Sequence, residues 1–488
     1  MTQALAVGQL GFRTWLARAF VAAVGVTVIA YGAASTVQVN LSAFGFAILA
    51  ILSTFQPIGT WRAGRVQAVA VFVLAGLIGY AACQTLPLPG LGLANGAWKS
   101  VSEIIGPVNG TISVAPGMTL DALTTLALPF LAFIAALAFF QGDDEALWLW
   151  RALAYFGAAY AAFGVLQEVL FPDQLLFEAK KYYVGYLTAT FVNRNTAGTF
   201  FGLALLLNLG LLFYELRKTR VVGFVNKALD FAIGWRDKEM LALVHAFCCL
   251  IIATALFLTQ SRGAVGATFI ALVVAVALIS TRRLTADKPR EEFVAWRRYA
   301  TIVAGLLVVV GLFALFAGRS VYRMQEQGSE DGRWCAFSST IAAIKDNWIF
   351  GAGFGAFQDV FPVYRDSDCA GIFGVWDRAH NFFLEGWLGL GLPFLVALAI
   401  GYLVLIAAFI RGVKVRHKFR FIPVMGLAAL ILASLHSLVD FSLQIPGVGV
   451  YFAAIMAATV TVSLGSGATR LRASPRERND DARFAEKF

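Results

Sequence analysis

The sequence predicts an all-α, polytopic integral membrane protein with about twelve transmembrane helices and one large outer loop. Composition is the first observation that predicts this fold class. The 488 residues are 59% hydrophobic and only 14% charged, and the mean hydropathy of +0.74 is far too high for a soluble globular protein of this size. The second observation is that apolar windows of roughly 20 residues, the length that spans a bilayer, recur along the chain.

The apolar windows give the predicted spans in order. Lipid offers the backbone no hydrogen-bond partners, so each crossing is expected to be a helix that satisfies its own backbone. The first window begins after Arg13 and ends without a small-residue cleavage site, so we interpret it as a retained helix rather than a signal peptide. The twelve windows lie near 15–35, 40–56, 66–84, 120–141, 148–171, 195–216, 240–260, 262–281, 299–317, 380–410, 421–440 and 444–466.

The charge distribution predicts the orientation of these spans. The formal net charge is +10, and the basic residues concentrate in alternate connections, such as 280–298 and 411–420. By the positive-inside rule these connections face the cytoplasm, so the charge is an orientation signal and implies no nucleic acid. An even number of spans places both termini in the cytoplasm, where 467–488 forms a solvated tail. Segment 217–239 mixes apolar and charged residues and is expected to lie on the inner leaflet.

The chain is predicted to form a single membrane domain, 1–488, with its largest outer loop at 318–379. No internal repeat of fixed period is recognisable, so nothing in the pattern indicates a repeat transporter. Within the loop, GRWCAFSSTIAAIKDN predicts a helix. The Gly-rich GAGFGAF that follows favours a turn over a phosphate-binding loop, because no strand precedes it and no lysine follows.

The cysteines divide between the spans and the outer loop. Cys248 and Cys249 fall within a span and are expected to be packing residues. Cys335 and Cys369 both fall in the outer loop, where an oxidising compartment would allow a disulfide between them. The loop also contains Asp366, Asp368 and Asp377, which could hold a divalent cation, although a solvated acidic loop is the preferred interpretation.

Several polar residues converge on the predicted outer side of the membrane. An ionisable residue at a membrane boundary is costly, so it usually faces a protein interior or a water-filled cavity. Each arginine alone could be capping a helix, and a lone histidine at a helix start could be bonded to a carbonyl. His245 is expected to be a buried hydrogen-bonding residue and His417 to be solvated. The outer-side residues are Arg194, Arg262, Arg333, His380, Glu385 and an i,i+4 pair of His436 and Asp440.

The combination of several fixed cations and one titratable base indicates a particular chemistry. Arginine binds phosphate through a planar, permanently charged fork, and imidazole can accept a proton near neutral pH. Together they suit a substrate with a diphosphate leaving group and a hydroxyl nucleophile.

These residues occur in motifs that resemble a known family. TQSRGA at a helix turn, a long outer loop with GRW and GAGFGAF, and then AHNFFLEGWLGLGLP resemble, in this order, the O-antigen ligase and polymerase superfamily of bacterial inner-membrane glycosyltransferases. The later LHSLVDFSLQIPG is similar to the closing segment of polymerase-like members. The resemblance covers roughly 190–460, and the first five spans add only a hydropathy match.

The resemblance implies a donor built on undecaprenyl diphosphate, with its glycan displayed in the periplasm. The acceptor is the sugar core of lipid A in ligases, another lipid-linked glycan in polymerases, or a protein hydroxyl. No nucleotide sugar, metal or other cofactor is implied, and a single displacement inverts the anomeric centre. The family therefore implies an enzyme of surface polysaccharide biosynthesis, of lipopolysaccharide or exopolysaccharide.

The motifs also assign roles to residues of this sequence. Arg262 and Arg333 match the arginines expected to hold the diphosphate, and His380 matches the histidine expected to activate the acceptor hydroxyl. Arg194 corresponds to a further diphosphate ligand, within Asn-Arg-Asn where the family has a string closer to Asn-Pro-Asn. Glu385 is expected to orient the imidazole, a role that Asp377 or Asp440 could fill equally well.

Two other classes stay open at the level of sequence. A transporter or flippase of a lipid-linked saccharide also commonly has twelve spans, although the missing repeat and the large outer loop count against it. A peptidoglycan-type polymerase uses a comparable lipid carrier but is expected to rely on an acidic residue instead of His380. Within the leading class, the sequence does not separate ligase from polymerase or reveal the sugar, the linkage or the acceptor.

Overall fold

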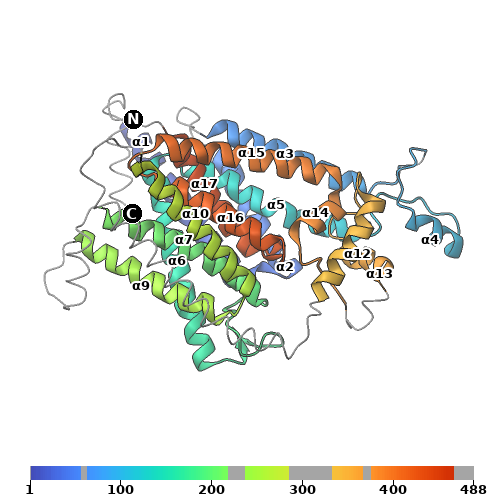
Figure 1. Cartoon of the computed structure of the whole chain (residues 1–488). Coiled ribbons are helices and arrows are strands. Elements are labelled where there is room, and N and C mark those ends of the chain that lie inside the picture. Colours follow the sequence, from blue (N-terminus) through green and yellow to red (C-terminus); the bar gives the residue numbers. More distant parts are fainter. Residues whose placement is uncertain are drawn as a thin grey trace. The chain divides into compact units, whose positions relative to one another are not determined.

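The computed structural model describes residues 2–55, 63–88, 90–217, 237–284, 332–366 and 375–465. Within these ranges, nine helices are long and apolar enough to cross a membrane. The predicted all-α, polytopic fold class is therefore confirmed (Figure 1). The nine helices are α2 (Thr36–Thr54), α3 (Gly64–Gln84), α5 (Pro116–Phe139), α6 (Asp143–Leu170), α7 (Arg194–Leu216), α9 (Asp237–Leu258), α10 (Arg262–Leu284), α15 (Leu392–Val415) and α17 (Pro446–Leu464).

Two further predicted spans coincide with helices outside this set. The first corresponds to α1 (Thr2–Ile29). The eleventh corresponds to α16 (Phe421–Ser437), an apolar helix of only 17 residues. The predicted span at 299–317 lies outside the described residues, so the total of twelve stays a prediction.

The predicted continuous span at 380–410 is wrong, because the chain breaks at Gly391. Helix α14 (Phe382–Leu390) ends there and α15 begins at the next residue. Gly391 has a φ of +64°, and a Cβ at this position would lie 2.2 Å from the carbonyl oxygen of Ile349. Only glycine fits this backbone conformation and this close approach. The break makes α14 a short separate helix, which carries the segment that follows His380.

The chain divides into two compact units. Unit 1 comprises Met1–Phe139, Glu330–Ala407 and Ser437–Ala457, and unit 2 comprises Phe140–Ser329, Ala408–His436 and Ala458–Phe488. The boundaries between them fall inside α15 and α17 as well as in connecting segments.

Unit 1 contains a bundle of apolar helices and a smaller helical layer. In the bundle, the Phe20 ring of α1 packs edge-on against Phe46 of α2, at 5.6 Å between centroids, and against Phe139 of α5, at 6.4 Å. The smaller layer consists of α12 (Gly332–Asn347), α13 (Phe357–Tyr364) and α14. Ala336 and Ala343 of α12 share one buried core with Phe361 of α13 and Leu388 of α14. Small alanines at this interface let the helices approach closely, which fixes the position of α14.

The Gly-rich stretch 351–357 joins α12 to α13 as a turn. All three of its glycines have positive φ: Gly351, Gly353 and Gly355. The N–H of Ala352 donates to Leu388 O at 2.7 Å, and the N–H of Gly353 donates to Gly389 O at 3.1 Å. These N–H groups are bound to protein carbonyls instead of pointing at a ligand, as the turn interpretation predicts and a phosphate-binding loop would not.

The buried side chain of Gln84, the last residue of α3, ties the same turn to the bundle. Its Nε2 donates to Phe350 O at 2.8 Å and to Gly389 O at 2.9 Å, and its Oε1 accepts from the N–H of Phe354 at 3.2 Å. One fully buried amide therefore satisfies three backbone groups at once.

Replacing Gln84 with leucine should lower the free energy of unfolding by about 1–3 kcal/mol, because the Phe354 N–H loses the acceptor that Gln84 supplies. Phe350 O keeps the Tyr80 hydroxyl and Gly389 O keeps the Gly353 N–H, so these two carbonyls lose only one of their donors. Thermal melting of the purified protein in detergent measures this change. The control is Gln358→Leu, which makes the same replacement at an exposed position of α13. Equal melting temperatures for the two variants would show that the amide is dispensable.

Unit 2 is built around α7, most of whose side chains are buried. The fully buried Trp150 of α6 donates from its indole N–H to Leu207 O at 3.3 Å. In α9, Nδ1 of the buried His245 lies 3.2 Å from Oδ1 of Asn208 in α7, and the His245 ring stacks on Tyr155 of α6. The prediction that His245 is a buried hydrogen-bonding residue is therefore confirmed.

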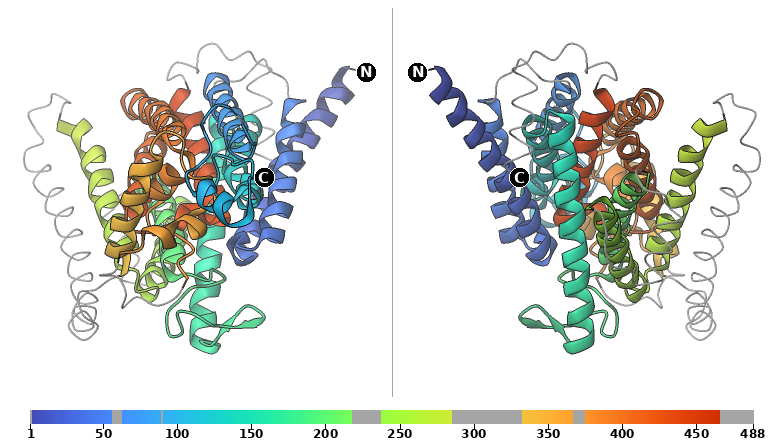
Figure 2. Two further views of the ribbon diagram at one scale, coloured as in Figure 1. Left: turned by 90° about the vertical axis from the view of Figure 1, so that its right-hand side faces the viewer. Right: turned by 90° about the vertical axis from the view of Figure 1, so that its left-hand side faces the viewer.

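Shorter elements complete the described chain. Figure 2 shows the hairpin of β1 (Gln174–Leu175) and β2 (Glu178–Ala179), which pair antiparallel beyond the end of α6. Helix α4 (Ala97–Ile105) lies in the segment between α3 and α5. Two 3₁₀ turns, η1 (Tyr31–Ala33) and η4 (Ser442–Gln444), follow α1 and precede α17.

The described cysteines fall into the two predicted groups, a disulfide-bonded cysteine of the outer loop and free cysteines in the helices. Cys335 of α12 is disulfide-bonded, whereas Cys83, Cys248 and Cys249 are free. Cys248 and Cys249 are buried in α9, as expected of packing residues. The predicted partner Cys369 lies outside the described residues, so the pairing stays a prediction.

Candidate functional site

His380 lies in unit 1, two residues before the start of α14 at Phe382, and its backbone has a φ of +53°. A non-glycine residue in the left-handed region costs free energy and persists only where its surroundings hold it. The imidazole is half-buried between two aromatic rings. Trp376 lies edge-on at 5.4 Å between ring centroids, and Phe441 lies edge-on at 5.0 Å. The His380 side chain thus projects from a strained turn and lies next to two aromatic rings.

The residue after His380 fixes this turn from one side. Asn381 is the N-cap of α14, and its side-chain oxygen accepts from the N–H groups of Phe383 and Leu384 at 3.0 and 3.1 Å. Its amide also donates to Leu438 O at 2.8 Å. Because one side chain both starts the helix and binds the segment after α16, His380 has little freedom to move.

Glu385 fixes the turn from the other side. One carboxylate oxygen accepts from Arg378 Nη1 at 3.0 Å, and the other accepts from the N–H of Ala379 at 2.8 Å. The Glu385 side chain is only 9% exposed, so this ion pair is partly shielded from water. Glu385 thereby holds the two residues that immediately precede His380, and it is a positioning residue for the turn.

This arrangement predicts a graded effect of substitutions at Glu385. Glu385→Ala should lower turnover by about 10- to 100-fold, because small misplacements of a reacting group are costly. Glu385→Gln should retain most activity, since an amide oxygen can still accept from the Ala379 N–H. Initial rates of the catalysed reaction measure both variants, and equal losses for Ala and Gln would indicate that the charge itself is needed.

Arg333 lies at the start of α12, in the same helical layer of unit 1, and is half-buried. Its neighbour Cys335 is disulfide-bonded, and Ala336, one turn further on, belongs to the core shared with α14. The beginning of α12 is thus anchored within the layer that carries His380 and Glu385.

Arg194 and Arg262 lie in unit 2, and each is the first residue of a helix, α7 and α10 respectively. The N-terminus of a helix carries unpaired N–H groups and a partial positive charge, which attract anions. Arg262 is exposed. The guanidinium of Arg194 lies over the rings of Tyr186, at 4.3 Å, and Tyr183, at 5.7 Å. These rings restrict the Arg194 side chain through cation–π contact.

A buried hydrogen bond joins the two helix starts. Ser261 Oγ donates to Asn195 Oδ1 at 2.8 Å, and both side chains are almost fully buried. The helices also approach closely at Gly198, where a Cβ would lie 2.7 Å from the Ala264 Cβ. Two helix N-termini, each opening with an arginine, are thereby held side by side. Such an arrangement can bind a multiply charged anion such as a diphosphate.

The predicted helical pair of His436 and Asp440 is wrong in its geometry. Helix α16 ends at Ser437, so Asp440 lies beyond the helix and the i,i+4 spacing does not apply. Nδ1 of His436 instead lies 2.6 Å from Oγ1 of Thr199 in α7. Asp440 is fully buried and accepts a hydrogen bond from Ser442.

Sequence reasoning missed the residues that support these groups. Asn195, Ser261 and Asn381 are polar side chains next to the selected arginines and histidine, at the starts of otherwise apolar windows. That pattern of a polar residue at a helix start could have identified them as caps or ties.

The described ranges contain no group of three or more His, Cys, Asp or Glu side chains placed to hold a metal ion. Asp368, one of the acidic loop residues considered for a cation, lies outside these ranges.

Comparison with known protein families gives a match to the O-antigen ligase family over residues 247–399. Comparison with curated proteins found no match. The matched region contains Arg262, Arg333, His380 and Glu385, whereas Arg194 lies before it. The predicted resemblance to the O-antigen ligase and polymerase superfamily is confirmed. The protein is accordingly a membrane-embedded, glycosyltransferase-like enzyme of polysaccharide biosynthesis.

Proposed function

We propose, from the O-antigen ligase family match of residues 247–399, that this protein transfers a glycan from an undecaprenyl diphosphate-linked donor to an acceptor hydroxyl on the periplasmic face. The acceptor is a second glycan or the lipid A core. The observation that carries the proposal is the pair of helix starts in unit 2, each opening with an arginine and joined through Ser261 and Asn195. Its positive charge complements a diphosphate.

The proposed reaction is a single displacement that needs no metal. His380 takes the proton of the acceptor hydroxyl as its oxygen forms a bond to C1 of the donor sugar. The bond between C1 and the diphosphate oxygen breaks, and the diphosphate leaves with the electron pair. Arg194, Arg262 and Arg333 bind the diphosphate and stabilise the charge that develops on it. Attack opposite the leaving group inverts the configuration at C1.

The contacts that fix the backbone turn at His380 support its assignment as the base. The Asn381 cap and the Glu385 contacts hold the turn on both sides of it, at a cost in backbone strain. Such strain concentrates at functional sites, where orientation matters more than stability.

The orientation of the protein in the membrane is part of the proposal. We expect 318–379 in the periplasm and 282–298 and 411–420 in the cytoplasm, because basic residues are retained on the inner side. An impermeant thiol reagent should label Lys345→Cys in intact spheroplasts, and it should label Lys418→Cys only after the membrane is opened. Both changes are made with Cys83 replaced by serine, since Cys83 is an exposed free thiol. The reverse labelling pattern would contradict the orientation.

The cellular test is the surface polysaccharide of a strain that lacks the protein. A polymerase predicts that single lipid-linked repeat units accumulate, and a ligase predicts full-length chains that are not attached to lipid A. In both cases the glycan accumulates on the periplasmic side. Accumulation of lipid-linked glycan on the cytoplasmic side would instead indicate a flippase and would overturn the proposed function.

A further inference from the structure

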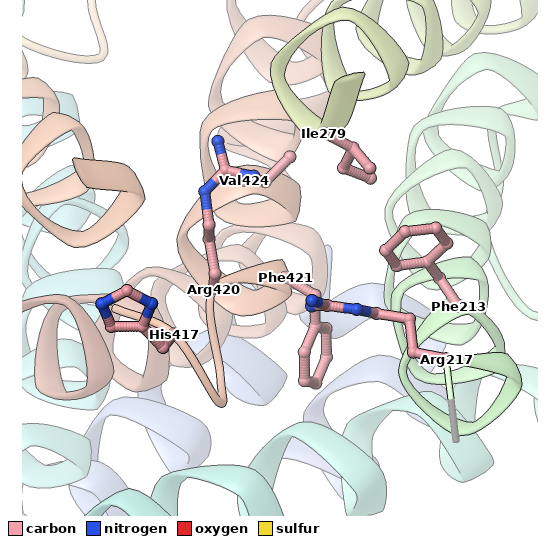
Figure 3. A pocket seen from close by; sticks show the side chains of 7 residues that line it. All are labelled: Phe213, Arg217, Ile279, His417, Arg420, Phe421 and Val424. Atoms are coloured by element: carbon pink, nitrogen blue, oxygen red, sulfur yellow. The ribbon is translucent and has the colours of Figure 1, made fainter. Parts of the chain in front are cut away.

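A pocket of about 380 Å³ lies in unit 2, at the end of the helices opposite to Arg194 and Arg262. It is formed by the last turns of α7 and α10 and by the segment that leads into α16. Figure 3 shows the side chains that line it, which are Phe213, Arg217, Ile279, His417, Arg420, Phe421 and Val424.

The lining of this pocket has two chemical halves. Arg217, His417 and Arg420 are basic, and none of the described lining residues is acidic. The remaining four side chains are aromatic or aliphatic. Figure 3 shows Arg217 extending from the end of α7, while His417 and Arg420 come from the segment before α16. The pocket thus offers positive charge next to apolar surface.

Its basic half is organised by the protein. Arg420 donates from Nε to Val413 O and from Nη2 to Leu278 O, both at 2.8 Å. These two bonds fix the guanidinium where it lines the pocket. In the apolar half, Phe421 packs against Tyr214 of α7 at 4.9 Å between ring centroids. A pre-organised pocket binds at a lower entropic cost than a mobile charged surface.

The position of the pocket separates it from the candidate diphosphate site. Helix α7 has 23 residues, so at about 1.5 Å per residue its two ends lie about 33 Å apart. This distance matches the hydrocarbon thickness of a bilayer, about 30 Å. The arginine pair at the helix starts and the basic pocket at the helix ends therefore lie at opposite faces of the membrane.

We propose that this pocket binds an anionic phospholipid of the membrane leaflet on the side away from Arg194 and Arg262. The lipid phosphate contacts Arg217, His417 and Arg420, and the first part of an acyl chain contacts Phe213, Ile279, Phe421 and Val424. Basic pockets between transmembrane helices bind anionic headgroups in this way. A free phosphate would use only the basic half and would leave the apolar half in water. The inference is independent of the proposed reaction.

The test measures lipid binding to the purified, delipidated full-length protein by native mass spectrometry. The lipids are phosphatidylglycerol and phosphatidylcholine. Phosphatidylglycerol should bind the unmodified protein with a defined stoichiometry, and phosphatidylcholine should bind far more weakly. Arg217→Gln and the double variant Arg217→Gln/Arg420→Gln should weaken phosphatidylglycerol binding about fivefold for each charge removed.

The matched control is Lys414→Gln/Lys418→Gln, which removes two exposed charges from the same end of unit 2 without touching the pocket lining. It should leave the high-affinity lipid in place. Equal losses in control and pocket variants would show a general surface-charge effect and overturn the proposal. Equal binding of phosphatidylcholine would also overturn it.

A thermal-melting arm separates a lipid site from a free-anion site. Phosphatidylglycerol should raise the melting temperature, whereas inorganic phosphate at the same concentration should not. An equal shift with phosphate alone would overturn the lipid assignment. If the double variant does not fold, the lipid binding of Arg217→Gln alone tests the proposal. Arg217 is exposed and contacts the Phe213 ring, so its replacement by glutamine should leave the fold intact.

Discussion

Replacing His380 with asparagine should lower the rate of glycan transfer by a factor on the order of 10²–10⁴, while the protein still binds its lipid diphosphate donor. Asparagine is the sharpest replacement at this position because it tolerates the left-handed backbone, φ +53°, that His380 adopts. It cannot, however, act as a base. His380→Ala should lose as much activity and should in addition be slightly less stable.

The measurement uses purified variants in detergent, checked first for folding by thermal melting. Initial transfer rates and donor binding are then determined separately. Near-normal transfer by a folded His380→Asn protein would rule out the base assignment. His380 would then be a helix-start residue that is held in place by Asn381 and by its aromatic neighbours.

Replacing Arg262 with alanine should weaken donor binding and turnover together, because a charge-assisted bond to the diphosphate is lost. Hydrogen bonds to charged groups contribute about 1.5–3 kcal/mol, so binding should fall about 10- to 150-fold. Arg262→Lys keeps the charge but lacks the planar fork, and it should recover only part of the loss. Arg333→Ala should follow the same pattern.

The matched control is Lys181→Ala, which removes an exposed cation from the segment just before α7 in the same unit. It should leave donor binding unchanged. Ser261→Ala offers an independent test, since it removes the hydrogen bond to Asn195 and leaves both arginines intact. Unchanged donor binding in the Arg262→Ala and Ser261→Ala proteins would contradict the anion site at the starts of α7 and α10.

The sequence was sufficient for the parts of the fold that depend on local hydrophobicity. The window at 195–216 corresponds closely to α7, because one uninterrupted apolar run specifies one helix. The window at 380–410 failed, because hydropathy does not detect a break when the residues on both sides of Gly391 are apolar. The close approach of Gly391 to Ile349, which requires the break, is a tertiary contact.

The same distinction explains the candidate site. His380 and the arginines could be selected because charge in an apolar sequence is conspicuous. Their supporting contacts were not predictable, since Ser261 and Asn195 are 66 positions apart and their pairing depends on how α7 packs against α10. The helical pairing of His436 and Asp440 failed for a related reason. Spacing along the chain implies a shared face only as long as the helix continues, and α16 ends at Ser437.

Glycan transfer by the purified protein tests the proposed reaction itself. The full chain is incubated with an undecaprenyl diphosphate-linked oligosaccharide and a hydroxyl acceptor without added metal, and the products are followed by mass spectrometry. We expect equal amounts of released undecaprenyl diphosphate and of glycan joined to the acceptor with inverted configuration at C1. Bound donor that stays intact with the competent acceptor present, or product with retained configuration, would contradict it.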